Sequence, residues 1–403
     1  MNKGTDQVVV TGIGTVSSFG VSSDSLWDAI QSGRYHSGDP DAESGHRTIR
    51  VPQDDLVPIL GTKGLRFVHG ASRFLLAAAD VAAEEAGLTG DAVDPDRLGI
   101  VVGSNYANLH TADLYDRTLL TEGPRAVSAM EAPNLLVNAP AALLGIRLQA
   151  RACNTTISTG ACAGLDALGY AMTLLRRGKA DCILVGGTEE VSRQLLGIYT
   201  MAGALPAAPT DETGRPFDAS SQGITPGEGA VAVVLERRSF AEARGARIQA
   251  QLASWTSGCA AGRSAAKREM SLTRVIGEAL DKAEAHPSEV GLVVSGASGQ
   301  ASLDGPESEA LQSVFGGWRT PITAVKGVTG ETAGAGGLFQ LFAAVRSQVS
   351  GIVPATAGAR VTVPAQSPLG LSIQPVRRES GERKPALLTA QDMSGTVSAV
   401  VIR

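Results

Sequence analysis

The chain has 403 residues, enough for one large or two medium domains with an extensive hydrophobic core. Its 35 Lys and Arg against 40 Asp and Glu, a net charge of −5 with no block of like charge, argue against binding to nucleic acid or an anionic membrane. Glycine is abundant, at 48 residues, but 43% of the chain is hydrophobic and no Gly-X-Y period is present, which excludes collagen-like and disordered chains.

Predicted strands and helices alternate along the first half of the chain. In order they are a strand at 8–10 that runs into turn residues at 11–14, a helix at 72–86, a strand at 98–102, a helix at 165–175, and strands at 182–185 and 231–235. The helix at 165–175 is the clearest, because its leucines and Met172 recur at steps of three and four on one face, and Gly178 follows it. A polar joint at 241–245 then separates the two halves.

The second half of the chain repeats this scheme. Its predicted elements are a strand at 248–255, a helix at 272–283, a strand at 292–294, a helix at 307–315, a strand at 322–325, a helix at 337–349 and a strand at 399–402. Most strands in both halves are continuously apolar, which indicates sheets buried on both faces and covered by helices on both sides. We therefore predict an α/β protein with an internal duplication of architecture, divided into halves at 1–244 and 245–403.

The N-terminus and the cysteines bear on the cellular compartment. The first residues, Met1–Gly4, are polar, and no run of about 18 apolar residues is present, so a cytoplasmic protein without a membrane span is expected. The chain has four cysteines, at Cys153, Cys162, Cys182 and Cys259. None lies in a C-x-x-C spacing and all lie in apolar or small-residue stretches, so we interpret them as buried thiols rather than metal ligands or disulfides.

The segment at 158–167 carries the strongest functional signal. It reads Ser-Thr-Gly-Ala-Cys-Ala-Gly-Leu-Asp-Ala and leads directly into the helix at 165–175. Small residues at a loop-to-helix junction let the backbone turn sharply and aim one side chain and several N–H groups at a ligand. This geometry suits a nucleophile.

The segment resembles the nucleophile elbow of the β-ketoacyl synthases, in which Ser-Thr-Gly-Cys or Thr-Ala-Cys precedes the helix. Further matches to this family follow in the same order: Val-Thr-Gly-Ile-Gly at 10–14, Pro-Asn-Leu-Leu-Val-Asn at 133–138, Val-Gly-Gly-Thr-Glu at 185–189, Arg-Pro-Phe-Asp at 215–218, Gly-Glu-Gly-Ala at 227–230 and Lys-Gly-Val-Thr-Gly at 326–330. The resemblance covers the whole chain. It implies an α/β fold, the thiolase-like duplicated five-layer αβαβα sandwich, and a dimer.

Three positions depart from the catalytic triad of that family. By resemblance, the nucleophilic Cys falls on Ala161, the first His on Gly296 and the second His on Glu331. Decarboxylative Claisen condensation needs a thiolate to hold the acyl group and two imidazole donors to stabilise the enolate. The family's Gly-Phe-Gly-Gly-Thr-Asn loop, which helps to form the oxyanion hole, is also reduced, at 392–397. We therefore predict that the chain has no catalytic residue of its own.

The chain lacks all three catalytic groups but keeps the other family motifs. In this combination it resembles the chain length factor, or ketosynthase β subunit, of type II polyketide synthases. The block at 304–311 also resembles a stretch of these subunits. The resemblance implies a heterodimer with a catalytic ketosynthase α subunit and an interface tunnel in which the growing chain is measured. It further implies an acyl carrier protein whose phosphopantetheine holds the thioesters, with no cofactor or metal bound by this chain.

The resemblance also suggests residues for the tunnel and the interface. These candidates are Leu109, Ala112, Asp116, Met130, Leu195, Leu196 and Gly197. The first three share one face of a helix expected within 105–120, and the last three are a candidate second wall. Met130 matches by position a residue that reaches toward the partner's active site. Small or polar residues on the helix would leave room for a longer chain than bulky aromatics would, although ordinary interface packing is an equal alternative.

Two residues near the degenerate triad have competing interpretations. Cys162, one position past the elbow apex, is either a displaced nucleophile or a small buried thiol, and the second is favoured because neighbouring side chains at such a turn point in different directions. Glu331 is a structural carboxylate paired with Lys326, a general base or a surface contact, with the first favoured. The leading hypothesis is a non-catalytic chain length factor. The alternatives are a condensing or acyl-transfer enzyme that uses Cys162, and a degenerate structural scaffold.

Overall fold

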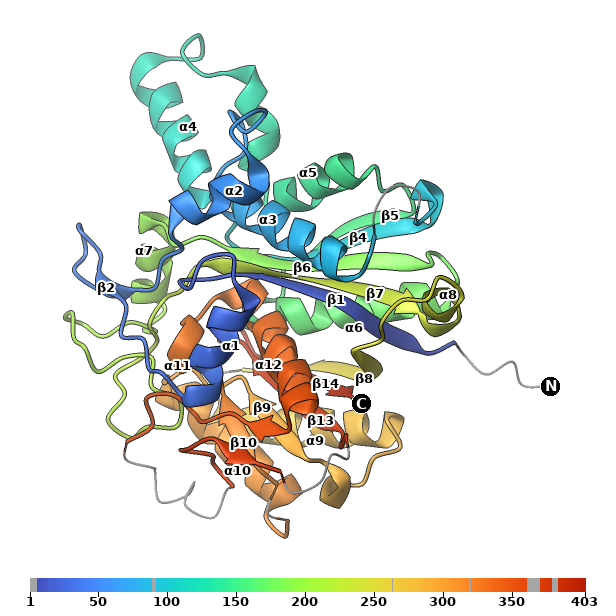
Figure 1. The fold of residues 1–403 in the computed structure, drawn as a ribbon. Helices are drawn as coiled ribbons and strands as arrows, with labels where there is room; N and C mark the ends of the chain where they lie inside the picture. Colours follow the sequence, from blue (N-terminus) through green and yellow to red (C-terminus); the bar gives the residue numbers. More distant parts are fainter. Residues whose placement is uncertain (1–5, 89–91, 263, 319, 361–369, 379–382) are drawn as a thin grey trace.

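The computed structural model describes residues 6–88, 92–262, 264–318, 320–360, 370–378 and 383–403 (Figure 1). The main strands are β1 Val8–Val16, β4 Leu98–Gly103, β5 Cys153–Ile157, β6 Cys182–Glu189, β7 Gly229–Arg237, β8 Ala250–Cys259, β9 Leu292–Ser295, β10 Ile322–Ala324, β13 Ala386–Gln391 and β14 Thr396–Ile402. They form one sheet, in the order β10-β9-β13-β14-β8-β1-β7-β6-β4-β5. Two small ladders are made by β2 Asp39–Pro40 with β3 Arg47–Thr48, and by β11 Ile352–Val353 with β12 Val376–Arg377.

The two halves of the large sheet have the same topology. Numbered along the chain within each half, the strands follow the order 3-2-4-5-1, as β5-β4-β6-β7-β1 and as β10-β9-β13-β14-β8. In each half the first two pairings of this order are parallel and the last two are antiparallel. The halves join where Val8–Val10 of β1 pairs with residues 250–252 of β8. The predicted duplication of architecture is confirmed.

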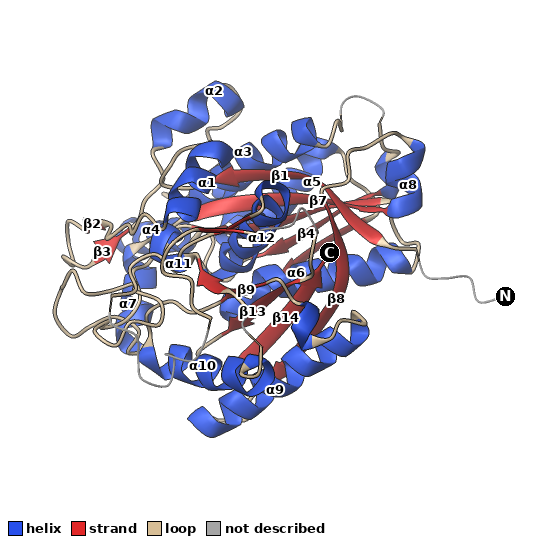
Figure 2. Cartoon of the chain, turned by 60° about the horizontal axis from the view of Figure 1, so that its bottom comes forward, coloured by secondary structure: helices blue, strands red, loops and turns tan. Residues whose placement is uncertain are grey.

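Six helices lie in three layers, one on the outer face of each half of the sheet and one between the halves (Figure 2). The outer face of the first half is covered by α3 Gly70–Glu85 and α5 Ala139–Leu148, the outer face of the second half by α9 Ala265–Lys282 and α10 Ala301–Phe315, and the space between the halves is filled by α6 Ala163–Arg176 and α12 Gly336–Ser350. The apolar face predicted for 165–175 is buried in a cluster that includes strand residues of both halves. This arrangement is the predicted αβαβα sandwich.

The remaining helices and 3-10 turns complete the chain. They are the helices α1 Ser23–Ser32, α2 Val57–Leu60, α4 Leu109–Glu122, α7 Arg193–Met201, α8 Arg238–Ala243 and α11 Lys326–Thr329, and the 3-10 turns η1 Gln53–Leu56, η2 Pro95–Arg97, η3 Ala129–Leu135, η4 Gly160–Cys162, η5 Pro287–Glu289 and η6 Ala333–Ala335. Of these, α4 projects from the top of the molecule in Figure 1 and buries none of its residues. No helix within the described residues is both long enough and apolar enough to span a membrane.

The turn predicted at 11–14 is wrong, because these residues continue β1. Gly12 and Gly14 let the backbone of α3 pack directly onto the strand. A Cβ atom at either glycine would overlap a carbonyl oxygen of α3, that of Ala82 or that of Ala78. These two glycines therefore serve a close approach between strand and helix and not a turn.

The joint predicted at 241–245 lies between the two halves, as expected, but it is not an irregular polar segment. Most of it belongs to α8, and Ala241 on this helix is completely buried. One buried small residue anchors the helix to the fold while its polar residues face solvent, a pattern too short to be read as helical periodicity.

Candidate functional site

A sharp turn between β5 and α6 forms the centre of the candidate site. Gly160 has a φ of 64°, a conformation that favours glycine, and its C=O and N–H both bond to the Asn105 side chain, each at 2.8 Å. Asn105 is in turn held by Glu189, whose Oε1 accepts the Asn105 backbone N–H at 2.6 Å. Burial raises the pKa of Glu189 to about 8, although three backbone N–H groups offset part of the rise. The apex of the turn is therefore firmly positioned.

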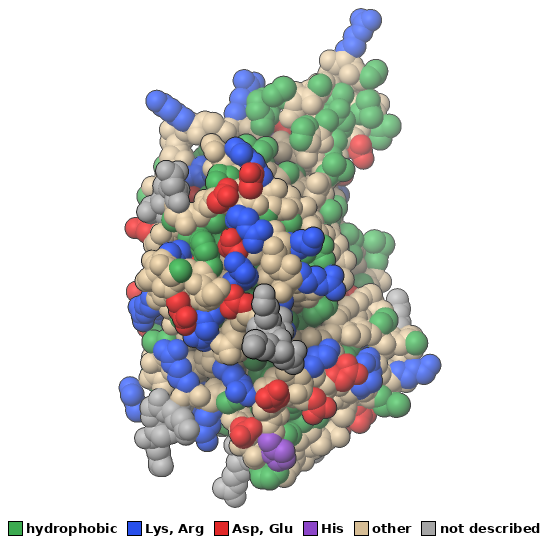
Figure 3. All heavy atoms as spheres, turned by 90° about the vertical axis from the view of Figure 1, so that its right-hand side faces the viewer, with side chains coloured by type: hydrophobic (Ala, Val, Ile, Leu, Met, Phe, Trp, Pro, Cys, Tyr) green, Lys and Arg blue, Asp and Glu red, His purple; other side chains and the backbone are tan. Residues whose placement is uncertain are grey.

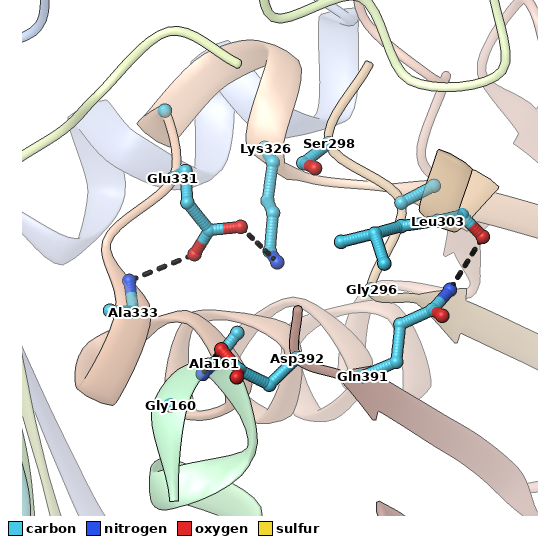
Figure 4. A network of polar contacts seen from close by, with 12 residues as sticks. Gly160, Ala161, Gly296, Ser298, Leu303, Lys326, Glu331, Ala333, Gln391 and Asp392 are labelled. Atoms are coloured by element: carbon cyan, nitrogen blue, oxygen red, sulfur yellow. Dashed lines mark hydrogen bonds and ion pairs between the residues drawn. The ribbon is translucent and has the colours of Figure 1, made fainter. Parts of the chain in front are cut away.

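The three positions to which the family resemblance assigns the catalytic triad converge on one cavity. Ala161, Gly296 and Glu331 all line it, and so do Lys326 and Asp392. Figure 4 shows Lys326 and Glu331 on one side of this space, with Ala161 and Asp392 on the other. The volume of the cavity is about 20 Å³, and a single water molecule already needs about 10–15 Å³. The cavity therefore has no room for an acyl thioester.

The backbone N–H at the apex of the elbow already donates a hydrogen bond to a carboxylate of the same chain. Oδ2 of Asp392 accepts the N–H of Ala161 at 3.1 Å, and its Oδ1 accepts the N–H of Ser394 at 2.8 Å. Arg268 on α9 fixes this loop by donating to the carbonyl oxygens of Asp392 at 2.6 Å and of Met393 at 3.2 Å. In acyl transfer, a backbone N–H at such an apex stabilises the developing oxyanion. Here that donor already binds an anion supplied by the chain itself.

A buried ion pair closes the opposite side of the cavity. Nζ of Lys326 lies 2.7 Å from Oε2 of Glu331, and the two side chains are only 3% and 9% exposed. Oε1 of Glu331 accepts the backbone N–H of Ala333 at 2.9 Å. Burial alone would lower the pKa of the Lys326 ammonium, but the adjacent Glu331 carboxylate outweighs burial and the pKa is raised. Both carboxylate oxygens are engaged within the protein, as the pairing interpretation of Glu331 requires.

The backbone of a neighbouring strand leaves no space for a side chain at Gly296. It follows β9, and its N–H donates to Oε1 of Glu307 at 3.0 Å. A Cβ atom added at Gly296 would lie 2.7 Å from the carbonyl oxygen of Thr389 and 3.1 Å from Cα of Ala390. Strand β13 thus packs directly against the position where the resemblance expects the first histidine.

The Cys162 thiol is completely buried beside the elbow. Its Sγ lies 3.4 Å from the carbonyl oxygen of Thr396. Burial raises the pKa of this thiol well above its ordinary value; the carboxylates of Asp166 and Asp392 add to the rise, and Lys326 opposes it. Because the thiolate is the reactive form of cysteine, a buried neutral thiol is a poor nucleophile. This environment argues against Cys162 as a displaced nucleophile.

We expect the rate of alkylation to differ between exposed and buried cysteines. Cys259, at the end of β8, is exposed, which corrects the expectation that all four thiols are buried, whereas Cys162 and Cys182 are buried. Brief treatment of the folded chain with iodoacetamide should modify Cys259 on the order of 100-fold faster than Cys162, as measured by peptide mass spectrometry. All four should react in urea. Fast modification of Cys162 in the folded chain would contradict this account of its environment.

Four of the tunnel and interface candidates lie in the projecting part of the molecule. Leu109 and Ala112 are half-buried on α4, Asp116 on the same helix is exposed, and Met130 in η3 is 64% exposed. Helix α4 contacts α7 and η3, and none of its residues is fully buried. The structure therefore brings these four residues to a surface that a second subunit could contact.

The other three candidates lie elsewhere. Leu195 and Leu196 on α7 are buried in a hydrophobic cluster with Tyr199 and Ile224, so in this chain they pack into the core and do not face an open channel. Gly197 is exposed, and an added Cβ atom there would meet no other atom within 4 Å. The description of these three as one wall is corrected, because helical geometry points Gly197 away from the two leucines.

Two residues that shape the site were not singled out from the sequence. Asp392 carries a signal, since an acidic residue stands in a loop that is Gly-rich in the resembling family. Asn105 carries none, because its partner Gly160 is 55 positions away along the chain and only the fold brings the two together. No group of three or more His, Cys, Asp or Glu side chains that could hold a metal ion exists among the described residues.

Comparison with known proteins gives consistent matches over the whole chain. The family model "Beta-ketoacyl synthase, N-terminal domain" matches residues 5–241, and "Beta-ketoacyl synthase, C-terminal domain" matches residues 249–360. The chain is similar to the tetracenomycin polyketide synthase ketoacyl synthase beta subunit of Streptomyces glaucescens, at 30% identity over 98% of both proteins.

Two solved structures share the fold over nearly their entire length. The ishigamide ketosynthase/chain length factor has a TM-score of 0.85 and 26% identity, with 99% of each chain covered. The complex AntDE:AntF, described as a type II PKS acyl-carrier protein in complex with its ketosynthase bound to the hexaketide, has a TM-score of 0.85 and 25% identity, again with 99% of each chain covered.

Proposed function

The chain belongs to the β-ketoacyl synthase family, and from this premise we propose that it is a non-catalytic chain length factor of a type II polyketide synthase. In this role it pairs with a catalytic ketosynthase α subunit and shapes the interface tunnel that measures the growing chain. The observation that carries the proposal is the closed site. Asp392 accepts the backbone N–H of Ala161 on one side of a cavity of about 20 Å³, and the Lys326–Glu331 ion pair lines the opposite side. The similarity to a ketoacyl synthase beta subunit and to a ketosynthase/chain length factor supports it.

An unpartnered surface supports pairing with a second subunit. Strand β5 is hydrogen-bonded only to β4 among the described residues, and such an edge is a ready template for another chain. Exposed apolar residues close to this edge and on the projecting segment are Leu114, Leu119, Leu120, Met130, Leu136 and Ile146. Figure 3 shows hydrophobic side chains gathered over the projecting upper part of the molecule, where α4 and η3 lie. Large exposed apolar patches mark protein interaction sites.

The chemistry in this proposal takes place on the partner. An acyl carrier protein delivers malonyl and polyketide thioesters on its phosphopantetheine, and the α subunit's cysteine holds the growing chain during condensation. Each cycle forms one C–C bond, releases CO₂ and lengthens the chain by two carbons. The AntDE:AntF neighbour, a carrier protein with its ketosynthase, supports this arrangement. The present chain contributes shape and binds neither cofactor nor metal.

Product analysis of the co-expressed complex tests the tunnel role. Leu109→Phe and Ala112→Phe enlarge side chains on the candidate tunnel face of α4, so the products should be shorter by one or more two-carbon units when measured by mass spectrometry. The matched control is Thr118→Phe, the same enlargement on the opposite face of α4, which should leave product length unchanged. Unchanged length in both tunnel-face variants would overturn the tunnel role, and full activity of the α subunit without this chain would favour a scaffold.

A further inference from the structure

A second cavity lies on the other side of α4 from the tunnel candidates. Its volume is about 540 Å³, and η1, the start of α3, α4 and η3 surround it. The α4 residues that line it are His110, Thr111, Leu114, Tyr115 and Thr118. At 100° per residue they share a face opposite Leu109, Ala112 and Asp116, none of which lines the cavity. This space belongs neither to the closed site nor to the proposed tunnel.

The ionisable groups of this cavity are carboxylates, imidazoles and a phenol. Glu131 and Glu190 line it with His69, His110 and the Tyr115 already named, and no Lys or Arg is among the lining residues. Oε2 of Glu131 lies 3.0 Å from Nε2 of His69, so this carboxylate has an imidazole partner. Glu190 forms no ion pair with a described residue. The wall therefore presents one carboxylate without a cationic neighbour in contact.

Glu190 is held in place from within the fold. It directly follows β6, it is 8% exposed, and its Oε2 accepts the backbone N–H of Ala71 at 3.2 Å. Gly70, with a φ of 25°, leaves the space that this carboxylate fills, because a Cβ atom there would overlap Oε2. Burial raises the pKa of Glu190, and the Ala71 amide and the charge of His110 offset part of the rise. A buried carboxylate without a counter-ion is costly, so a cation at this wall would stabilise it.

We propose that this cavity binds a small organic ammonium ion. The charge of the ion lies against Glu190, and its apolar part contacts Leu114, Val127 and the ring of Tyr115, whose face also attracts cations. The volume lies within the range of about 300–1,000 Å³ that is typical of small-molecule sites. An anion would meet two carboxylates, and a neutral molecule would leave Glu190 without a counter-ion.

Ligand-observed NMR titration of the full chain with three probes of similar size tests this site. The probes are benzylamine, which is cationic at pH 7, benzyl alcohol, which is neutral, and benzoate, which is anionic. Benzylammonium should bind at least about tenfold more tightly than benzyl alcohol, because contacts to an ionised group are stronger than neutral ones, and benzoate should bind most weakly. Equal affinity for the three probes, or tighter binding of benzoate, would overturn the proposal.

Three variants locate the binding. Glu190→Gln should remove the preference for the cation, and Thr118→Phe should block all three probes by filling the cavity without changing its charge. Asp116→Asn is the matched control, since it removes one carboxylate from the same helix outside the cavity and should leave all affinities unchanged. If both Glu190→Gln and Thr118→Phe still bound benzylammonium more tightly than the other two probes, the ammonium site would lie elsewhere. Circular dichroism verifies that each variant is folded, and the Thr118→Phe result stands even where Glu190→Gln does not fold.

Discussion

Replacing Lys326 by Met is expected to lower the free energy of unfolding by about 3–5 kcal/mol. The substitution keeps most of the side-chain volume but removes the ammonium that lies 2.7 Å from Glu331. Both side chains are nearly inaccessible to solvent, so the carboxylate of Glu331 would remain buried without a counter-ion. Urea denaturation of the purified chain, followed by circular dichroism, measures the loss.

Two controls separate loss of the ion pair from loss of packing. Arg274 and Glu278 form an exposed pair with the same 2.7 Å separation, so Arg274→Met should cost no more than about 1 kcal/mol. The double variant Lys326→Met/Glu331→Gln should be markedly more stable than Lys326→Met, because glutamine is neutral and still offers an oxygen to the N–H of Ala333. A loss in Lys326→Met no greater than in Arg274→Met would contradict the account.

The effect of pH on this pair has a definite sign. The pKa of Lys326 in the folded chain is raised above the ordinary value of 10.5. A raised lysine pKa gives stability that is fully present below the unfolded value and is lost as pH rises through the folded value. The difference between wild type and Lys326→Met should therefore be constant near neutral pH and shrink only in alkaline solution above about 10.5.

Restoring the three family groups is expected to cost stability without restoring condensation. Gly296→His must displace β13, since its Cβ atom would lie 2.7 Å from the carbonyl oxygen of Thr389, and we expect a loss of about 1–3 kcal/mol. Glu331→His would also leave the Lys326 ammonium without its carboxylate. Ala161→Cys would supply a thiol, but the amide of that residue is held by Asp392. The triple variant should form no condensation product from acyl and malonyl carrier-protein thioesters.

Gly277→His on α9 is the matched control for the steric cost of Gly296→His. Apart from the backbone of its own helix, no atom lies within 4 Å of a Cβ atom added there, so this substitution should cost less than Gly296→His. Equal stability losses at the two positions would contradict the claim that β13 closes position 296. Condensation by the triple variant in the absence of a partner would contradict the claim that the site is closed.

The sequence predicted the alternating strands and helices and the two similar halves well because these depend on apolar runs, whereas the five-layer sandwich was expected from the family resemblance. The helix at 165–175 is buried between the two halves and the strand at 182–185 is buried inside the sheet, and continuous or periodic hydrophobic stretches are the main requirement at both places. The β13 strand, Ala386–Gln391, was not predicted, although it lies inside the second half of the sheet. Its mixture of Ala, Leu, Thr and Gln carries neither alternation nor a long apolar run, and its burial is set by neighbouring elements.

The sequence predicted which catalytic groups are missing from the candidate site, but it did not predict the contacts that close the site. The absence of a thiol at Ala161 and of imidazoles at Gly296 and Glu331 can be read directly from the family motifs. That Asp392 would bind the elbow amide depends on bringing together residues 231 positions apart. The Lys326–Glu331 pair is five residues apart, and for that reason the sequence could suggest it.

The central claim, that this chain is a non-catalytic member of a condensing pair, is tested most directly by intact-protein mass spectrometry of the complex after incubation with an acyl carrier protein thioester. The account predicts that the partner subunit gains the mass of the acyl group and that this chain keeps its unmodified mass. An acyl adduct on this chain that disappears in Cys162→Ser would contradict the account and identify Cys162 as a nucleophile.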